Sequence, residues 1–195
     1  FMKTHNAMCS INGYNFTDKE NTLAAIYMVR DPRNLITSLS NHYDLTLDEA
    51  LEFLTNKRKI IFPINKKNKD PEDFNFLADW STHYRSWKNI NFCPIKIIKY
   101  EDFILDTEKN FIIVLEFLSK FIPINLDEKK IKKALDTTNF ENMRKMEKKD
   151  GFIESATSLK ENKKIPFFNL GKKNDWEKLL DKKLVKKIEN YFEPD

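Results

Sequence analysis

The stretch that most constrains the fold of this chain is LAAIYMVRDPRNLITSLSNHY at Leu23–Tyr43, because it combines a buried strand, a tight turn and a helix. Residues 23–29 form a short apolar run with β-branched and aromatic members, which is typical of a strand covered on both faces. Asp31 is a good N-cap and Pro32 a good first helical residue, so a helix should begin there. Apolar side chains then recur at helical spacing, at Leu35, Ile36, Leu39 and Tyr43. The stretch therefore predicts a strand followed directly by a helix, as in α/β proteins.

Two polar side chains flank the junction between this strand and this helix. Arg30 follows the strand at its carboxyl end, and Ser38 lies about two helical turns beyond it. Ligands of α/β proteins bind outside the carboxyl ends of the strands, where a helix start also offers free N–H groups. The planar fork of an arginine makes paired, charge-assisted bonds to phosphate. The pattern favours an anion site, but it also fits Arg30 paired with Asp31 or another acid, and Ser38 facing solvent.

Composition places the chain among globular proteins and narrows its partners. It has 195 residues, enough for a single domain over 1–195 with a substantial core, and 41% of them are hydrophobic and 33% charged. A net charge of +4 is too mild to require nucleic acid or a membrane as partner, and no apolar run is long enough to span a bilayer. Cys9 and Cys93 show neither metal spacing nor a disulfide framework, which favours a reducing, cytoplasmic setting.

The first residues, FMKTH, have the pattern of a strand end whose beginning is absent. Side chains alternate along a strand, so Lys3 and His5 would share one face. There the lysine can stabilise developing negative charge, while the histidine can act as a base near neutral pH. A frayed terminus with two solvated polar side chains is the simpler interpretation of these residues alone. Because Phe1 is not an initiator and the last residues, NYFEPD, lack a clear terminator, we expect a fragment truncated at both ends.

Hydrophobic periodicity predicts one more buried strand, Ile95–Tyr100, and several amphipathic helices. Helices are expected over Thr46–Thr55, over Glu72–Asn89, over a segment that Asp106 or Thr107 caps and Pro123 closes, over Asp127–Leu135 and over Asp181–Phe192. The aromatic side chains of the second of these helices should be core: Phe76, Trp80, Tyr84 and Trp87. His83 on the same helix is interpreted as structural or exposed rather than catalytic. Residues 148–168 should be a loop, with a lid as one interpretation.

Taken in order, several segments resemble the family of sulfotransferases that use 3'-phosphoadenosine 5'-phosphosulfate (PAPS), in its cytosolic and bacterial branch. These segments are KTH at 3–5, VRDPRNLITSLSNHY at 29–43, IIKYEDF at 97–103, TTNFENM at 137–143 and NLGKKNDW at 169–176. Each motif is weak alone, but their order and separations match the family over nearly the whole chain. The resemblance implies a helix-rich α/β fold like that of P-loop NTPases, with three α/β/α layers around a central parallel sheet. The sheet would be incomplete here, because the family's N-terminal strand, 5'-phosphosulfate loop and helix are absent.

The resemblance also implies a function and a role for each matched position. The chain would transfer a sulfuryl group from PAPS, its co-substrate, to a hydroxyl or amine acceptor, and no metal is implied. His5 would take the proton of the acceptor, and Lys3 would support the charge that develops around the sulfuryl group. The residues implied to bind the donor are Arg30, Ser38 and Gly171 at its 3'-phosphate, and Tyr100, Thr138 and Phe140 at its adenine.

The sequence departs from the family pattern at this donor site. Asn-Leu at 169–170 stands where the family carries Arg-Lys before the glycine, although the lysine pair at 172–173 can compensate in part. Asn174 replaces a second glycine, and Asn139 stands where the family often has serine. The absent phosphosulfate loop would cradle the sulfate-bearing end of the donor with backbone N–H groups. We therefore expect this chain alone to be a poor enzyme.

The sequence leaves other functions open. A catalytically silent nucleotide-binding or scaffold protein of the same fold is the main alternative, favoured by the lost Arg-Lys pair. A nucleotide kinase fits less well because of the Arg30 and Ser38 pair, and because no acid is obviously placed for Mg²⁺. The acceptor would be a small molecule or a glycan, in a pocket built from residues 60–64, Phe74, His83 and residues 148–168. The oligomeric state is left between a monomer and a homodimer.

Overall fold

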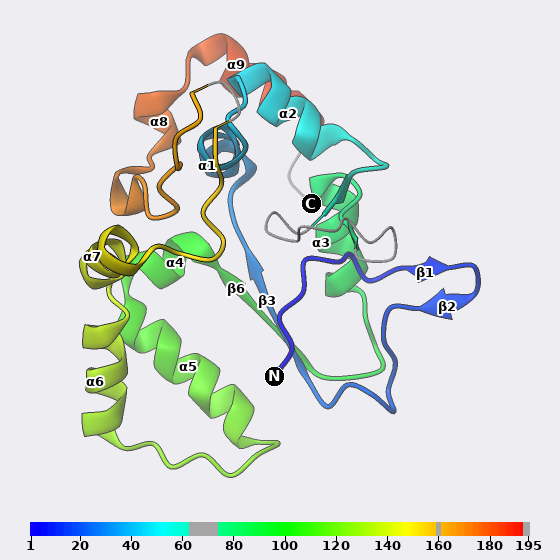
Figure 1. Ribbon diagram of the computed structural model, residues 1–195. Coiled ribbons are helices and arrows are strands. Elements are labelled where there is room, and N and C mark those ends of the chain that lie inside the picture. Colours follow the sequence, from blue (N-terminus) through cyan, green and yellow to red (C-terminus); the bar gives the residue numbers. More distant parts are fainter. Residues whose placement is uncertain (63–73, 159–160, 193–195) are drawn as a thin grey trace.

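Two parallel strands, β3 (Ala25–Val29) and β6 (Ile95–Lys99), lie at the centre of the computed structural model of this protein (Figure 1). The structure describes residues 1–62, 74–158 and 161–192. Its helices are α1 (Pro32–Tyr43), α2 (Leu47–Thr55), α3 (Trp80–Lys88), α4 (Tyr100–Leu105), α5 (Thr107–Ser119), α6 (Glu128–Thr137), α7 (Phe140–Asp150), the 3₁₀ turn η1 (Gly171–Lys173), α8 (Trp176–Leu179) and α9 (Lys182–Tyr191). Short antiparallel pairs join β1 (Ser10–Ile11) to β2 (Tyr14–Asn15) and β4 (Ile60–Ile61) to β5 (Asn75–Phe76).

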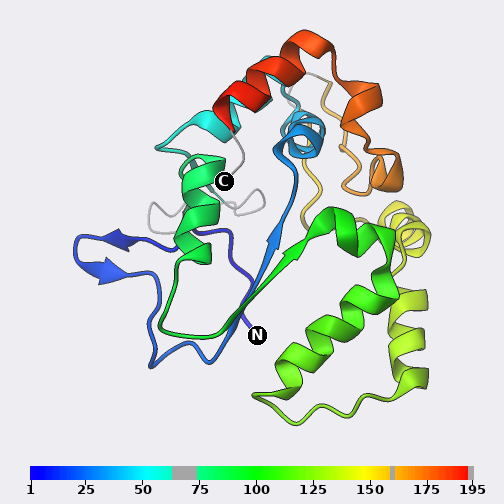
Figure 2. The ribbon, with the colours of Figure 1, turned by 180° about the vertical axis from the view of Figure 1, so that it is seen from behind.

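The parallel pair sets the position of the expected site. β3 and β6 pair over their full length, with Val29 opposite Lys99. Helices α3 and α5 lie on opposite sides of the pair, and the two strands lead to α1 and α4 (Figures 1 and 2). Because a helix follows each strand almost at once, the carboxyl ends bring Arg30 and Tyr100 to the same edge of the sheet.

The strand expected at residues 23–29 is confirmed over Ala25–Val29, but its expected cover on both faces is wrong. Exposure alternates along the strand, and Ile26 is 40% exposed and Met28 48% exposed. Both side chains line the large cavity described below. Within the described part of the chain, this face of β3 therefore borders an opening rather than a packed helix.

Helix α1 begins where the sequence predicts, because its cap and its first residue are both in place. The Asp31 side chain accepts a hydrogen bond from the backbone of Arg33, and Pro32 is the first helical residue. Helix α2 likewise begins after Thr46, whose side chain forms a reciprocal capping box with Glu49. Aspartates at 106, 127 and 181 cap α5, α6 and α9. The helices predicted at these places are confirmed.

The main apolar core lies between helices α1, α2 and α9. Its buried members are Ile36, Ala50, Leu51, Leu54, Leu180, Leu184 and Ile188. Ile36 is fully buried, and burying such a side chain stabilises a fold by about 1.5–3 kcal/mol. This packing anchors the helix that carries Ser38. Among the residues that the structure describes, no helix has the length and apolar character that a membrane span needs.

The strand expected at FMKTH is wrong, because residues 1–9 contain no strand. The backbone here is held by the edge of β5 and by side chains instead. The backbone N–H of Ala7 donates to the Phe76 carbonyl at 2.7 Å, and that of His5 lies 3.4 Å from the Asn75 side-chain oxygen. The positions of Lys3 and His5 therefore follow from these contacts and not from strand alternation.

The helix expected over residues 72–89 begins later, at Trp80. Residues 72 and 73 lie outside the described part, and Phe76 belongs to strand β5 rather than to the helix. Ala78 has a φ of 56°, a left-handed conformation that interrupts a helix. Asp79 then caps α3 by accepting a hydrogen bond from the third helical backbone N–H.

Two further boundaries differ from the expectation. Tyr100, expected to end the second strand, is the first residue of α4. Helix α7 extends to Asp150, inside the expected loop at 148–168, of which residues 159 and 160 lie outside the described part.

Candidate functional site

A cavity of about 2020 Å³ opens at the carboxyl ends of the parallel strands. Its wall includes every residue to which the resemblance assigns a role: Lys3, His5, Arg30, Ser38, Tyr100, Thr138, Phe140 and Gly171. These residues come from the N-terminal segment, from α1, α4 and α7, and from the loops beside them. The structure thus brings them together, while their roles stay predictions.

Arg30 lies in the cavity wall beside Ser38 and Tyr100. Its Nη1 donates to the Ser38 hydroxyl at 2.7 Å, and its guanidinium lies 4.4 Å from the centroid of the Tyr100 ring. Among the residues that the structure describes, its Nε is buried without a hydrogen-bond partner, and the Glu101 carboxylate oxygen is 4.0 Å away. Burial lowers the pKa of Arg30, although Tyr100 and nearby acids oppose this effect. A buried guanidinium with an unused N–H is suited to an anion.

The alternative in which Arg30 pairs with Asp31 or another acid is met through Glu101, whose Oε1 lies 4.0 Å from Arg30 Nε, the limit of an ion pair. Asp31 pairs with Arg33, whose Nη2 lies 2.7 Å from its Oδ2. Ser38, for its part, binds Arg30 rather than merely facing solvent.

Asn174 is a polar contact of this site that the sequence reasoning missed. Its Nδ2 donates to the Ser38 hydroxyl at 3.1 Å and to the Asn34 carbonyl at 2.8 Å, and its Oδ1 accepts from the Thr37 hydroxyl. The Ser38 oxygen accepts from both Arg30 and Asn174, so the hydroxyl hydrogen is the part of this group that can donate to a ligand. The sequence showed only that an asparagine replaces a glycine here. The side-chain hydrogen bonds of Asn174 all go to residues far away along the chain, so no local pattern reveals them.

A second network fixes the start of α1 against the segments that carry the site. Glu101 accepts from the backbone N–H of Asp31 at 3.2 Å and from the Asn34 amide at 3.3 Å. The buried Asn34 also accepts from the backbone of Trp176 at 3.0 Å. Arg33 lies 4.1 Å from the centroid of the Trp176 ring. The acid of the IIKYEDF segment and the tryptophan of NLGKKNDW therefore hold α1 in place.

Gly171 and Phe140 are in direct contact in the cavity wall, where Gly171 also lines a smaller pocket beside Arg30 and Tyr100. A Cβ on Gly171 would lie 2.8 Å from the Phe140 ring, so only a glycine lets the ring approach this closely. Thr138 ends α6, and its hydroxyl donates to the Ala134 carbonyl at 2.7 Å. Asn139, which departs from the family pattern, caps α7 by accepting from the backbone of the third helical residue.

Lys3 and His5 line the same cavity as Glu154, a carboxylate that the sequence reasoning did not single out. Lys3 Nζ forms an ion pair with Glu154 at 2.5 Å. Burial and the Lys3 charge lower the pKa of His5, and Glu154 raises it. Burial also lowers the pKa of His42, which Glu154 raises and His5 lowers. Both imidazoles line the cavity.

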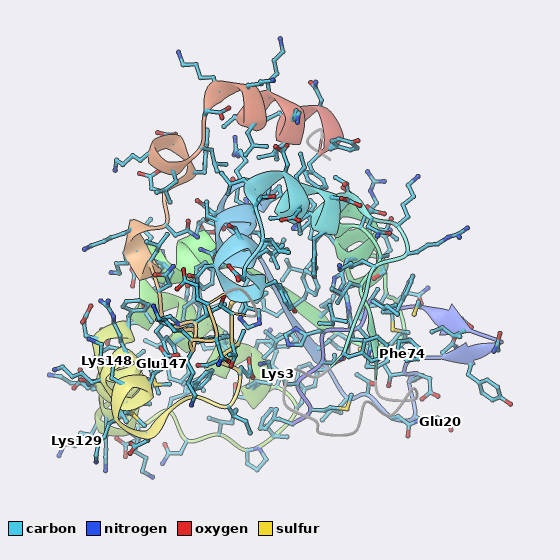
Figure 3. All side chains as sticks on the ribbon, turned by 45° about the horizontal axis from the view of Figure 1, so that its top comes forward. Lys3, Glu20, Phe74, Lys129, Glu147 and Lys148 are labelled. Atoms are coloured by element: carbon cyan, nitrogen blue, oxygen red, sulfur yellow. The ribbon has the colours of Figure 1, made fainter. Side chains whose placement is uncertain are left out.

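The loop that carries Glu154 is held to α7 by one carboxylate. Glu147 accepts from the backbone N–H groups of Phe167 and Phe168, at 2.6 and 3.0 Å, and from the Ser155 hydroxyl at 2.6 Å. In the view of Figure 3, Lys3 lies near the middle of the molecule and Glu147 on α7 to its left. These contacts place Glu154, Phe167 and Phe168 in the wall of the cavity.

Some of the residues expected to form the acceptor pocket line the cavity. Ile61, His83 and several residues of the 148–168 loop line the cavity, whereas Phe74 does not. Residues 63 and 64 lie outside the described part of the chain.

Replacing Glu154 with glutamine is expected to lower the pKa of His5, because the imidazolium loses a stabilising negative charge and Lys3 is freed of its partner. Replacing Lys3 with methionine should raise it, since a repelling positive charge is lost. Both shifts start from a pKa already below the ordinary 6.5. They can be followed as the pH titration of the His5 imidazole proton by NMR.

Glu161→Gln, on the same loop, is the control and should not change the pKa of His5. Shifts in the same direction for both variants would contradict the prediction.

Comparison with known protein families gives a match over the whole chain. A family model described as "Sulfotransferase domain" matches residues 1–195. No curated protein matches. Among solved structures, mouse sulfotransferase SULT7A1 complexed with PAP is similar, with 18% sequence identity and a TM-score of 0.51 over 86% of this chain and 56% of the mouse chain. This likeness confirms the expected fold class, a helix-rich, P-loop-like α/β fold with a parallel sheet.

Proposed function

Because the chain belongs to the sulfotransferase domain family, we propose that it transfers a sulfuryl group from PAPS to a hydroxyl or amine of a small molecule or glycan, with His5 as general base. The observation that carries this proposal is the group of Arg30, Ser38 and Asn174 at the end of β3. It offers an unused guanidinium N–H and a hydroxyl hydrogen to an anion. A 3'-phosphate is an anion of suitable geometry for such a fork.

The chemistry of the rest of the cavity supports this donor. The mouse neighbour is described as complexed with PAP, adenosine 3',5'-bisphosphate, the product that PAPS leaves after transfer. The exposed lysine pair at 172–173 adds positive charge at the rim, and Lys172 lines the cavity. The Phe140 and Tyr100 rings offer flat apolar surfaces for an adenine.

The proposed reaction is an in-line displacement at sulfur. The acceptor oxygen or nitrogen forms a bond to sulfur while the bond from sulfur to the 5'-phosphate oxygen breaks, and the acceptor proton passes to His5. A lowered pKa leaves His5 neutral near pH 7 and so ready to accept that proton. The Lys3 ammonium would exchange Glu154 for the sulfuryl oxygens as negative charge builds on them. Positioning and charge stabilisation supply most of the rate in such transfers.

A catalytically silent nucleotide-binding relative is the second candidate. Asn169 and Leu170 line the cavity where the family carries Arg-Lys, and they bring no charge to the donor. In the structure Lys3 is engaged by Glu154. Both observations favour binding without turnover.

Calorimetric titration with adenosine 3',5'-bisphosphate, beside 5'-AMP, tests the donor site once circular dichroism shows a folded chain. Incubation with PAPS and a panel of phenols, alcohols, amines and oligosaccharides, followed by mass spectrometry, tests transfer. Tighter binding of the bisphosphate with a sulfated product supports the enzyme, provided that His5→Asn removes the product and keeps the binding. Tighter binding without product supports the silent relative. Equal binding of both nucleotides would overturn the 3'-phosphate site.

A further inference from the structure

Side chains of helix α3 that lie one turn apart form hydrogen bonds to the backbone of the segment that carries His5. His83 Nε2 lies 3.1 Å from the His5 carbonyl oxygen, and Trp87 Nε1 donates to the next carbonyl, that of Asn6, at 2.9 Å. The Ser86 hydroxyl accepts from the backbone N–H of Met8 at 2.9 Å. Because residues 1–9 form no strand, these side-chain contacts replace the backbone ladder that a strand would supply. The helix face of residues 83, 86 and 87, here called the α3 clamp, thus fixes the backbone next to His5.

The hydrogen bonds of His83 fix which of its nitrogens carries the proton. A carbonyl oxygen only accepts, so Nε2 must donate to His5. In a neutral imidazole Nδ1 is then an acceptor, and the Tyr27 hydroxyl, 2.9 Å away, donates to it. Burial lowers the pKa of His83, which favours this neutral form. A chain of donors therefore runs from Tyr27 on β3, through His83 on α3, to the backbone of His5.

We propose that His83 is a positioning residue, which fixes the backbone of His5 and so aims its imidazole into the cavity, while Tyr27 sets the tautomer of His83. The catalytic part of this inference rests on the proposed function, since it needs His5 to act as the base. The clamp itself rests on the distances from His83 to Tyr27 and to His5. Sequence reasoning assigned His83 a structural or exposed role and a place in the wall of the acceptor pocket. It did not link His83 to His5, because the two residues are 78 positions apart along the chain.

Two substitutions at His83 separate positioning from mere packing. In His83→Gln the side-chain amide reaches about as far as Nε2 and can still donate to the His5 carbonyl. In His83→Asn the amide ends near the place of Nδ1 and cannot reach it. We expect His83→Asn to lower kcat by about 100-fold, as a misplacement of about 1 Å at a reacting group can, with the affinity for adenosine 3',5'-bisphosphate unchanged. His83→Gln should restore most of kcat, and Tyr27→Phe should fall between the two.

An NMR measurement tests the clamp without turnover. In the wild-type chain the imidazole nitrogen resonances of His83 should show a protonated Nε2 and an unprotonated Nδ1 at neutral pH. The backbone amide resonances of residues 4–7 should move in His83→Asn and stay in place in His83→Gln. A wild-type chain that transfers no sulfuryl group but shows these resonances would overturn the proposed function and support the clamp.

Two results would overturn the clamp. One is a wild-type His83 protonated at Nδ1, which can be read even if His83→Asn fails to fold. The other is a set of resonances and kcat values that are the same in His83→Asn and His83→Gln. A fall in bisphosphate affinity that matches the fall in kcat would also overturn it, because a general loss of structure predicts that pattern.

Discussion

Replacing Arg30 with alanine is expected to weaken the binding of adenosine 3',5'-bisphosphate by about 100-fold and to leave that of 5'-AMP nearly unchanged, because hydrogen bonds to charged groups are worth about 1.5–3 kcal/mol. The Arg30 side chain is 19% exposed and has an unused Nε. Because the Arg30 side chain is largely buried, a phosphate bound to its guanidinium would compete with little water for these hydrogen bonds. Calorimetric titration of both nucleotides against wild-type and variant chains measures the difference.

Two further variants show whether the fork or only the charge matters. Arg30→Lys keeps the charge but loses the planar fork, so its loss of affinity should be intermediate. Arg58→Ala removes an exposed arginine that does not line the cavity and should change neither affinity. Equal weakening of both nucleotides by Arg30→Ala would contradict the prediction, because it would place the guanidinium at a part that the two nucleotides share.

Local signals in the sequence predicted the part of the fold that carries Arg30 and Ser38. A cap at Asp31 and a proline at the first helical position specify where α1 begins, and neither depends on distant residues. The apolar run before them specifies a strand. The junction between strand and helix then places Arg30 at the carboxyl end of β3. The resemblance added the remaining site residues, and the structure collects them around one cavity.

The parts that sequence reasoning missed depend on contacts between distant segments. The strand expected at FMKTH is absent, and its backbone is held by residues about seventy to eighty positions away. Asn174 reaches Ser38 across 136 positions, and Lys3 reaches Glu154 across 151. Periodicity and capping rules describe only neighbours along the chain, so they cannot reveal such pairs. The left-handed Ala78, which delays α3, likewise has no signature in residue type.

Replacing Gly171 with alanine is expected to lower the free energy of unfolding by about 2–5 kcal/mol, the sum of two costs. Gly171 has a φ of 55°, where a side chain costs about 1–2 kcal/mol. The added Cβ would also lie 2.8 Å from the Phe140 ring, and displacing a packed ring costs about 1–3 kcal/mol. Urea unfolding followed by circular dichroism measures the change.

Gly13 and Phe140 supply the controls that separate these costs. Gly13 has a φ of 84° and open space where a Cβ would lie, so Gly13→Ala should show the conformational cost alone. In a Phe140→Leu background the shorter side chain relieves the contact, and Gly171→Ala should then cost no more than Gly13→Ala. The difference between the two backgrounds is the coupling between residues 140 and 171. If Gly171→Ala costs the same in both backgrounds, the two residues are not coupled and the close packing of this wall of the cavity is wrong.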